Sequence, residues 1–231
     1  MKKLIMYWFI LFILIIIWLY KYLVYELKIS HPTLQPYLKS NYYLAFIKSW
    51  NNQNFIFYPW AFVSADAYMP LASCLSENWV NTYIAKMPLY FALFDTKAAN
   101  RIIKYFSWSF DWKVSIWWHS LWWVAASMYI NSSTWADRLI LLWSYSNQKI
   151  TWVKILSLIW ENDWLVNYEK VMLNSWFLVA KDTKYILISW ANHSQFWRYW
   201  LQKWDNQSTI NAHSQLRLVC DDIANWLKNT K

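Results

Sequence analysis

The chain contains no glycine, and this absence constrains its folding more than any other feature of the sequence. At the usual glycine frequency of about 7%, a chain of this length would hold roughly 16. Tight turns and helix ends use glycine because these positions take backbone conformations that a Cβ atom disfavours. The chain holds 22 tryptophans instead. A conventional fold therefore requires other residues at the positions where glycine is expected.

Tryptophan stands at several of these positions. Residues 117–123 read WWHSLWW, and with glycine for each tryptophan they become GGHSLGG, which contains the G-x-S-x-G pattern. We hypothesise that the gene uses UGA as a glycine codon, as some bacterial lineages do, and was translated with a table that gives tryptophan. UGG codons at positions 118 and 122 would contradict this hypothesis. The alternative is a protein that is genuinely rich in tryptophan.

The N-terminal segment is strongly apolar. After Lys2 and Lys3, residues 4–20 carry no charge, and about 17 residues is the lower limit for crossing a bilayer of ~30 Å. No small-x-small cleavage site follows, so an uncleaved anchor over residues 1–30 is favoured over a cleaved signal peptide. We predict a single-pass membrane protein. The two lysines favour a cytoplasmic N-terminus, which would place the remaining domain outside the cytoplasm.

Residues 31–40 contain two prolines and are predicted to form a linker to a single domain over residues 41–231. Strand and helix patterns alternate in this domain, which predicts an α/β fold with a mostly parallel sheet and helices on both faces. Residues 41–48 are predicted to form an antiparallel strand on the edge. The further strands are expected at 54–59, 80–85, 113–116, 138–142, 154–159 and 184–189, and the helices at 65–77, 96–106, 121–130, 167–178 and 211–227.

Charge and cysteine usage exclude several classes of function. The net charge of +9 comes from singly scattered residues rather than a basic stripe, so no nucleic-acid partner is expected. Cys74 and Cys220 stand alone without metal-ligand spacing, and neither a metal nor another cofactor is expected. Both lie in apolar helical stretches, where free cysteine behaves as a small hydrophobe. A disulfide between them is the alternative for a domain outside the cytoplasm.

Ser120 lies between a predicted strand and a predicted helix, which is the context that a nucleophile elbow requires. The backbone N–H of Leu121 would then face a developing oxyanion. A second N–H donor is expected from the loop 59–62, with Ala61 favoured and Phe62 second. The alternative is that Ser120 is an ordinary helix N-cap.

Asp163 and His193 each follow a predicted strand, and both come after Ser120 in the chain. Ser–Asp–His is the chain order of the catalytic residues in α/β-hydrolases. His193 would accept the proton of Ser120, and Asp163 would fix its tautomer. Glu161 is the second candidate for the acid.

With glycine for tryptophan, the chain resembles the α/β-hydrolase fold-5 family of small, often membrane-anchored hydrolases. The resemblance covers about residues 54–227 and departs from the family pattern at Ala61 and Arg198, where glycine and an acidic residue are usual. The matching stretches are FYPW at 57–60, DAYMPLA at 66–72, KMPL at 86–89, the elbow, and ANHSQFW at 191–197, followed by YW at 199–200 and WD at 204–205. The resemblance implies the α/β-hydrolase fold and hydrolase activity.

These observations together predict a membrane-anchored serine hydrolase that cleaves a small-molecule ester through an acyl-enzyme on Ser120. Carboxylesterases, lipases and thioesterases are the classes of enzyme that fit. The alternative function is a catalytically silent α/β-hydrolase-fold protein that binds a partner or ligand.

Overall fold

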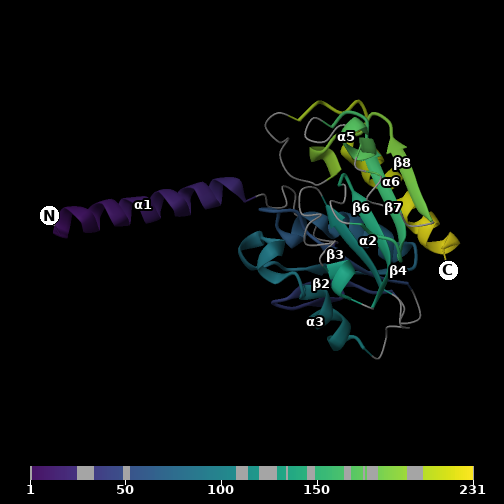
Figure 1. The fold of residues 1–231 in the computed structure, drawn as a ribbon, viewed down its shortest axis with the longest axis horizontal. Coiled ribbons are helices and arrows are strands. Elements are labelled where there is room, and N and C mark those ends of the chain that lie inside the picture. Colours follow the sequence, from purple (N-terminus) through teal and green to yellow (C-terminus); the bar gives the residue numbers. More distant parts are fainter. Residues whose placement is uncertain are drawn as a thin grey trace.

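The computed structural model describes residues 2–24, 34–48, 53–107, 114–119, 129–133, 135–144, 149–163, 168–173, 175, 182–196 and 205–230. In this part of the chain the strands form an eight-stranded sheet with helices packed against it, and helix α1 lies apart from the sheet (Figure 1). The strands are β1 (Leu38–Lys39), β2 (Tyr43–Phe46), β3 (Gln53–Tyr58), β4 (Val80–Ala85), β5 (Val114–His119), β6 (Ala136–Leu142), β7 (Lys154–Trp160) and β8 (Thr183–Ile188). The helices are α1 (Lys2–Leu23), α2 (Met69–Glu77), α3 (Ala98–Tyr105), α5 (Tyr168–Leu173) and α6 (Ala212–Asn229), with short 3-10 helices η1 (Ala65–Tyr68), η2 (Pro88–Tyr90), η3 (Ala92–Asp95) and η6 (Ser194–Phe196).

The strand order is β1-β2-β4-β3-β5-β6-β7-β8. From β4 to β8 all neighbouring strands are parallel, whereas β2 pairs antiparallel with both β4 and β1. The predicted mostly parallel sheet is confirmed, and residues 41–48 contain the predicted antiparallel strand. That strand is not the outermost one, because β1 forms within the segment that was predicted to be a linker.

The sheet is buried on both faces, and β3 shows this directly. Phe55 and Phe57 pack in one core with residues of α2 and α6, whereas Ile56 and Tyr58 pack in a second core with residues of α3. Successive strand residues point to opposite faces. Helices on both faces of the sheet are therefore confirmed, and both cores lie directly against the central strands.

Most predicted helices form where their periodicity places them. The predicted helix 65–77 is η1 followed by α2, while 96–106 and 211–227 contain α3 and α6. Helix α5 lies within the predicted 167–178, and most of the predicted helix 121–130 lies outside the described residues. The predicted strand 113–116 continues to His119 in β5.

The predicted transmembrane helix is not supported and needs correction. Helix α1 occupies the expected segment, but among the described residues no helix is both long enough and apolar enough to cross a membrane. Lys3 and Lys21 bound the uncharged stretch, which leaves about 17 residues, the lower limit for a span.

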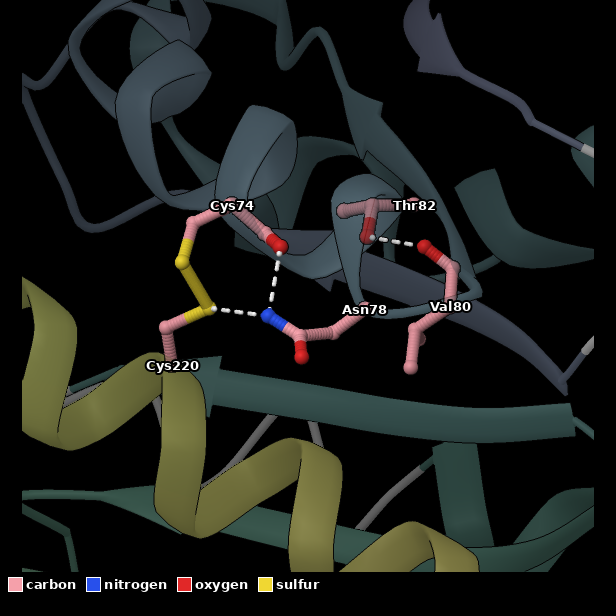
Figure 2. Close-up of a disulfide and its surroundings, with 5 residues drawn as sticks. All are labelled: Cys74, Asn78, Val80, Thr82 and Cys220. Carbon is pink, nitrogen blue, oxygen red and sulfur yellow. Dashed lines mark hydrogen bonds between the residues drawn. A yellow bond between two sulfur atoms is a disulfide. The ribbon is translucent and has the colours of Figure 1, made fainter.

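The two cysteines form a disulfide, which corrects the expectation that both are free. Cys74 on α2 and Cys220 on α6 are joined with a Cα–Cα distance of 6.2 Å, within the usual range for a disulfide. The Asn78 side-chain amide donates to the carbonyl of Cys74 and lies 3.6 Å from the Sγ of Cys220 (Figure 2). The pairing depends on α2 and α6 packing on the same sheet face, which the sequence pattern does not reveal.

Three tryptophans hold backbone conformations that favour glycine. The φ angle is 67° at Trp79 and Trp190, and 51° at Trp143. Trp79 follows the end of α2, where the sequence pattern calls for a glycine cap. These positions support the glycine reading of tryptophan. Positive φ also occurs at three residues that this reading does not explain, namely Phe62, Leu89 and Tyr90.

Candidate active site

The candidate catalytic residues follow strands that end at one edge of the sheet. Ala61 follows β3, Asp163 follows β7, and His193 follows β8. Ser120 and Leu121 lie outside the described residues, and Ser120 is bonded directly to the last residue of β5. Because these strands are parallel, their carboxyl ends share one edge of the sheet, where α/β proteins bind ligands.

Asp163 and His193 form a buried pair. Oδ2 of Asp163 lies 2.5 Å from Nδ1 of His193, and both side chains are fully buried. A carboxylate at this distance accepts the Nδ1 proton, which fixes the tautomer in which Nε2 is the basic nitrogen. This arrangement equips His193 to accept and return a proton through Nε2.

Neither Glu161 nor His213 forms part of this buried pair. Glu161, the second candidate for the acid, is exposed, and its Oε2 accepts from the backbone N–H of Trp190 at 3.0 Å. His213 is exposed on α6. Across the described residues, no group of three or more His, Cys, Asp or Glu side chains could hold a metal ion.

The backbone on both sides of His193 is held by buried polar contacts. Nε2 of Gln215 donates to the carbonyl of Asn192 at 2.6 Å, and its Oε1 accepts from the N–H of Asn192. On the other side, Asp205 accepts from both the N–H and the hydroxyl of Ser194 at 2.7 Å. These contacts make Gln215 and Asp205 positioning residues for His193.

Sequence reasoning missed both positioning residues, although one left a signal. Gln215 is fully buried on the face of α6 that also carries Val219 and Ile223. A lone amide in an apolar stripe with a spacing of four indicates a specific partner, because a buried polar group requires a hydrogen bond. Asp205 lies in a stretch that resembles the family, but the sequence does not identify Ser194 as its partner.

The turn after β3 is held by the neighbouring 3-10 helix. The hydroxyl of Tyr68 accepts from the N–H of Trp60 at 2.7 Å, and the N–H of Val63 donates to the carbonyl of Trp60 at 3.1 Å. Burial raises the pKa of the Tyr68 hydroxyl well above its usual range, so this group stays neutral. The turn is thus closed on itself and joined to η1 through the Tyr68 hydroxyl.

The two candidates for the second oxyanion donor, the N–H groups of Ala61 and Phe62, differ in their hydrogen bonding. The N–H of Phe62 donates to the carbonyl of Tyr90 at 2.9 Å, so it is already engaged. The N–H of Ala61 has no hydrogen-bond partner among the described residues. The ring of Trp60 lies edge-on to the His193 ring, with centroids 5.0 Å apart. The turn therefore contacts His193, and Ala61 remains the predicted second oxyanion donor because the Phe62 N–H is engaged.

Solved structures share this fold at low sequence identity. The apo form of Thermogutta terrifontis esterase 2 has a TM-score of 0.59 at 12% identity, covering 86% of this chain and 98% of that one. A protein described as a predicted CIB-like hydrolase from Thermoplasma acidophilum has a TM-score of 0.57 at 12% identity and covers 79% and 91%. A cold-adapted esterase from an Arctic intertidal metagenomic library has a TM-score of 0.56 at 8% identity and covers 79% and 87%. At these identities the likeness establishes the fold alone.

The family assignment rests on the sequence itself. No curated protein matches the chain. The alpha/beta hydrolase family matches residues 54–217, which contain Ser120, Asp163 and His193. This match spans more than half of the chain and confirms the resemblance seen in the sequence. The chain therefore belongs to the alpha/beta hydrolase family.

Proposed function

We propose that this protein is a serine hydrolase that cleaves a carboxylic ester, with Ser120, His193 and Asp163 as its catalytic residues. The observation that carries the proposal is the fully buried pair of Asp163 and His193, with 2.5 Å between Oδ2 and Nδ1. Ser120 directly follows the parallel strand β5, whose carboxyl end lies at the same sheet edge. A base oriented by an acid beside a serine is the arrangement that activates a hydroxyl nucleophile.

In the first half-reaction, Oγ of Ser120 forms a bond to the ester carbonyl carbon while its proton passes to Nε2 of His193. Asp163 stabilises the imidazolium that results. The bond to the alkoxy leaving group then breaks, and the leaving group takes the proton from His193 and departs as an alcohol. Water deacylates Ser120 by the same steps in reverse and releases the acid.

The oxyanion of the tetrahedral intermediate would accept hydrogen bonds from the N–H groups of Leu121 and Ala61. The Ala61 N–H supports this role, because it has no partner among the described residues. Preorganised donors of this kind each contribute about 10²–10³ in rate.

The names of solved relatives favour an ester as the substrate class. Two of the similar structures are described as esterases. One of them, Thermogutta terrifontis esterase 2, is also described as phosphonylated by cyclosarin. For the compartment, we propose an oxidising one outside the cytoplasm, because disulfides such as Cys74–Cys220 persist there.

A fluorophosphonate probe tests the proposed nucleophile. The expected result is one covalent adduct on Ser120, found by peptide mass spectrometry, together with hydrolysis of 4-nitrophenyl esters. Ser120→Ala should lose the adduct and reduce ester turnover about 10⁴-fold, because the nucleophile acts as a unit with His193. Ser107→Ala, at an exposed serine after α3, is the matched control and should retain both properties.

A folded protein with no adduct on Ser120 and no ester turnover would contradict the proposal. That result would favour the alternative of a catalytically silent protein that binds a ligand.

A further inference from the structure

A cavity of about 420 Å³ lies beside the turn after β3, at the carboxyl ends of β3 and β4. Its wall includes Pro59 and Ser64 from that turn, Lys86 directly after β4, and Lys39 from β1. The volume lies within the range of small-molecule sites. The chain thus has room for part of a substrate on the side of the turn that the mechanism does not use.

Positive charge predominates among the described residues of the cavity wall. There Lys39 and Lys86 stand with a single carboxylate, that of Asp66. Nζ of Lys86 donates to the carbonyl of Ser40 at 2.6 Å, which anchors this ammonium group. Burial and the charge of Lys39 lower the pKa of Lys86, while Asp66 acts in the opposite direction. A bound anion would stabilise the charged form of both lysines.

A buried hydroxyl in the cavity wall also calls for a ligand. Ser64 is only 7% exposed, and within the described part of the chain its Oγ has no hydrogen-bond partner. It precedes η1, yet its side chain makes no capping bond there. A buried hydroxyl without a partner is costly, and rotation of the Ser64 side chain toward the cavity would let a ligand oxygen satisfy this hydroxyl.

The cavity and the reaction centre lie against the same short turn. Pro59 lines the cavity, and the next residue, Trp60, contacts the His193 ring. Tyr90, another residue of the cavity wall, accepts the N–H of Phe62 next to Ala61. Neighbouring Cα atoms are ~3.8 Å apart, so the cavity wall at Pro59 and the candidate oxyanion donor at Ala61 lie only two residues apart on this turn.

We propose that this cavity binds a negatively charged oxygen group of the substrate, a carboxylate or a phosphate, through Lys86, Lys39 and the hydroxyl of Ser64. Val63, Met87 and Leu89 of the cavity wall would contact the hydrocarbon that joins this group to the ester. The inference rests on the proposed hydrolase function and narrows its substrates to esters that carry an anionic arm.

Two 4-nitrophenyl esters of equal chain length test this inference on the full chain. The monoglutarate ester ends in a carboxylate, and the valerate ester ends in a methyl group. The expected KM is about tenfold lower for the monoglutarate ester, because hydrogen bonds to charged groups are the strong ones. Inorganic phosphate and free glutarate, added as competitive inhibitors, distinguish a phosphate site from a carboxylate site by their relative strength.

Variants assign the preference to the cavity. Lys86→Gln should raise KM for the monoglutarate ester about tenfold and change kcat/KM for the valerate ester far less. Ser64→Ala should act in the same direction with a smaller effect. Lys104→Gln, at an exposed lysine on α3, is the matched control and should change neither ester. Calorimetric binding of free glutarate to wild type and Lys86→Gln gives the same comparison without turnover.

Failure of this inference can be distinguished from failure of the proposed function. Cleavage of the valerate ester that depends on Ser120, with no preference for the monoglutarate ester, overturns this inference alone. Valerate turnover that survives Ser120→Ala overturns the proposed function. Equal glutarate binding to wild type and Lys86→Gln overturns the assignment of the cavity whatever the activity.

Discussion

The two halves of the candidate site are built differently. One half consists of the segments that would carry the acid and the base, residues 161–163 and 189–196 (the acid–base loops). Here the side chains of Asp163 and His193 are fully buried. The backbone beside His193 is held by hydrogen bonds to Gln215 and Asp205. The turn that would bind the oxyanion, residues 59–63 (the oxyanion turn), is held by the Tyr68 hydroxyl and by the hydrogen bond between Phe62 and Tyr90, and it lies against a cavity. A catalytic base must keep a fixed orientation, whereas a substrate needs space to enter the site. The rigid contacts therefore belong to the half that would transfer protons under the proposed function.

A covalent bond joins the helices behind the two halves. Helix α2 follows the oxyanion turn through η1, and α6 carries Gln215, which holds the His193 loop. The disulfide Cys74–Cys220 links these two helices (Figure 2). The comparison therefore predicts large effects on rate in the acid–base loops, a large effect on stability at the disulfide, and small effects in the oxyanion turn.

The largest effect is expected from the acid. Asp163→Asn should lower kcat about 10⁴-fold, because an amide stabilises the wrong tautomer of His193. Glu161→Gln is the matched control and should change kcat little, since its side chain is exposed and bonds to the backbone of Trp190. Steady-state kinetics on a 4-nitrophenyl ester measures both. A reversed order of the two variants would show that Glu161 is the acid.

The disulfide should have the next largest effect. Its cysteines are 146 residues apart, and a loop of that size predicts about 5 kcal/mol of stabilisation through the entropy of the unfolded chain. The double variant Cys74→Ala, Cys220→Ala should lose about this free energy of unfolding in urea. Dithiothreitol should destabilise the wild type and leave the double variant unchanged. Equal sensitivity of both proteins to dithiothreitol would contradict the pairing.

A smaller effect is expected from the oxyanion turn. Tyr68→Phe removes the acceptor of the Trp60 N–H, and a hydrogen bond contributes about 1 kcal/mol, so kcat should fall about tenfold or less. KM should change little, because the cavity side of the turn is retained. Tyr42→Phe, at an exposed tyrosine, is the control. A loss in Tyr68→Phe as large as that in Asp163→Asn would remove the proposed contrast between the two halves.

The smallest effect is expected from a change that relieves backbone strain in the acid–base loops. Trp190 has φ 67° and is 56% exposed, so Trp190→Gly should relieve strain without opening a cavity and stabilise the protein by about 1 kcal/mol. Trp152 is 49% exposed and is not among the described residues with positive φ. Trp152→Gly should therefore destabilise by about 0.5–1 kcal/mol through backbone entropy. Thermal unfolding measures both, and equal shifts would show that the positive φ at Trp190 carries no strain.

Much of the architecture could be predicted from local pattern. Apolar runs separated by helical periodicity predicted the parallel strands, and the position of Asp163 and His193 after two of them brought these residues to one edge of the sheet. The prediction succeeds because strand direction and chain order together determine which residues share an edge. The end of the predicted helix 65–77 was also correct, since α2 ends at Glu77.

Other features depended on contacts between distant segments. The choice of Asp163 over Glu161 for the buried position was decided by packing, because both residues follow β7 within three positions of each other. The pairing of Cys74 with Cys220, the hold of Gln215 on the His193 loop and the cavity between β1, β3 and β4 all join parts of the chain that are far apart. Periodicity is a local property, so the sequence by itself determined most of the elements and their order along the chain. Side-chain packing across the finished sheet decided which groups are buried, paired or left facing a cavity, because these depend on how distant surfaces fit together.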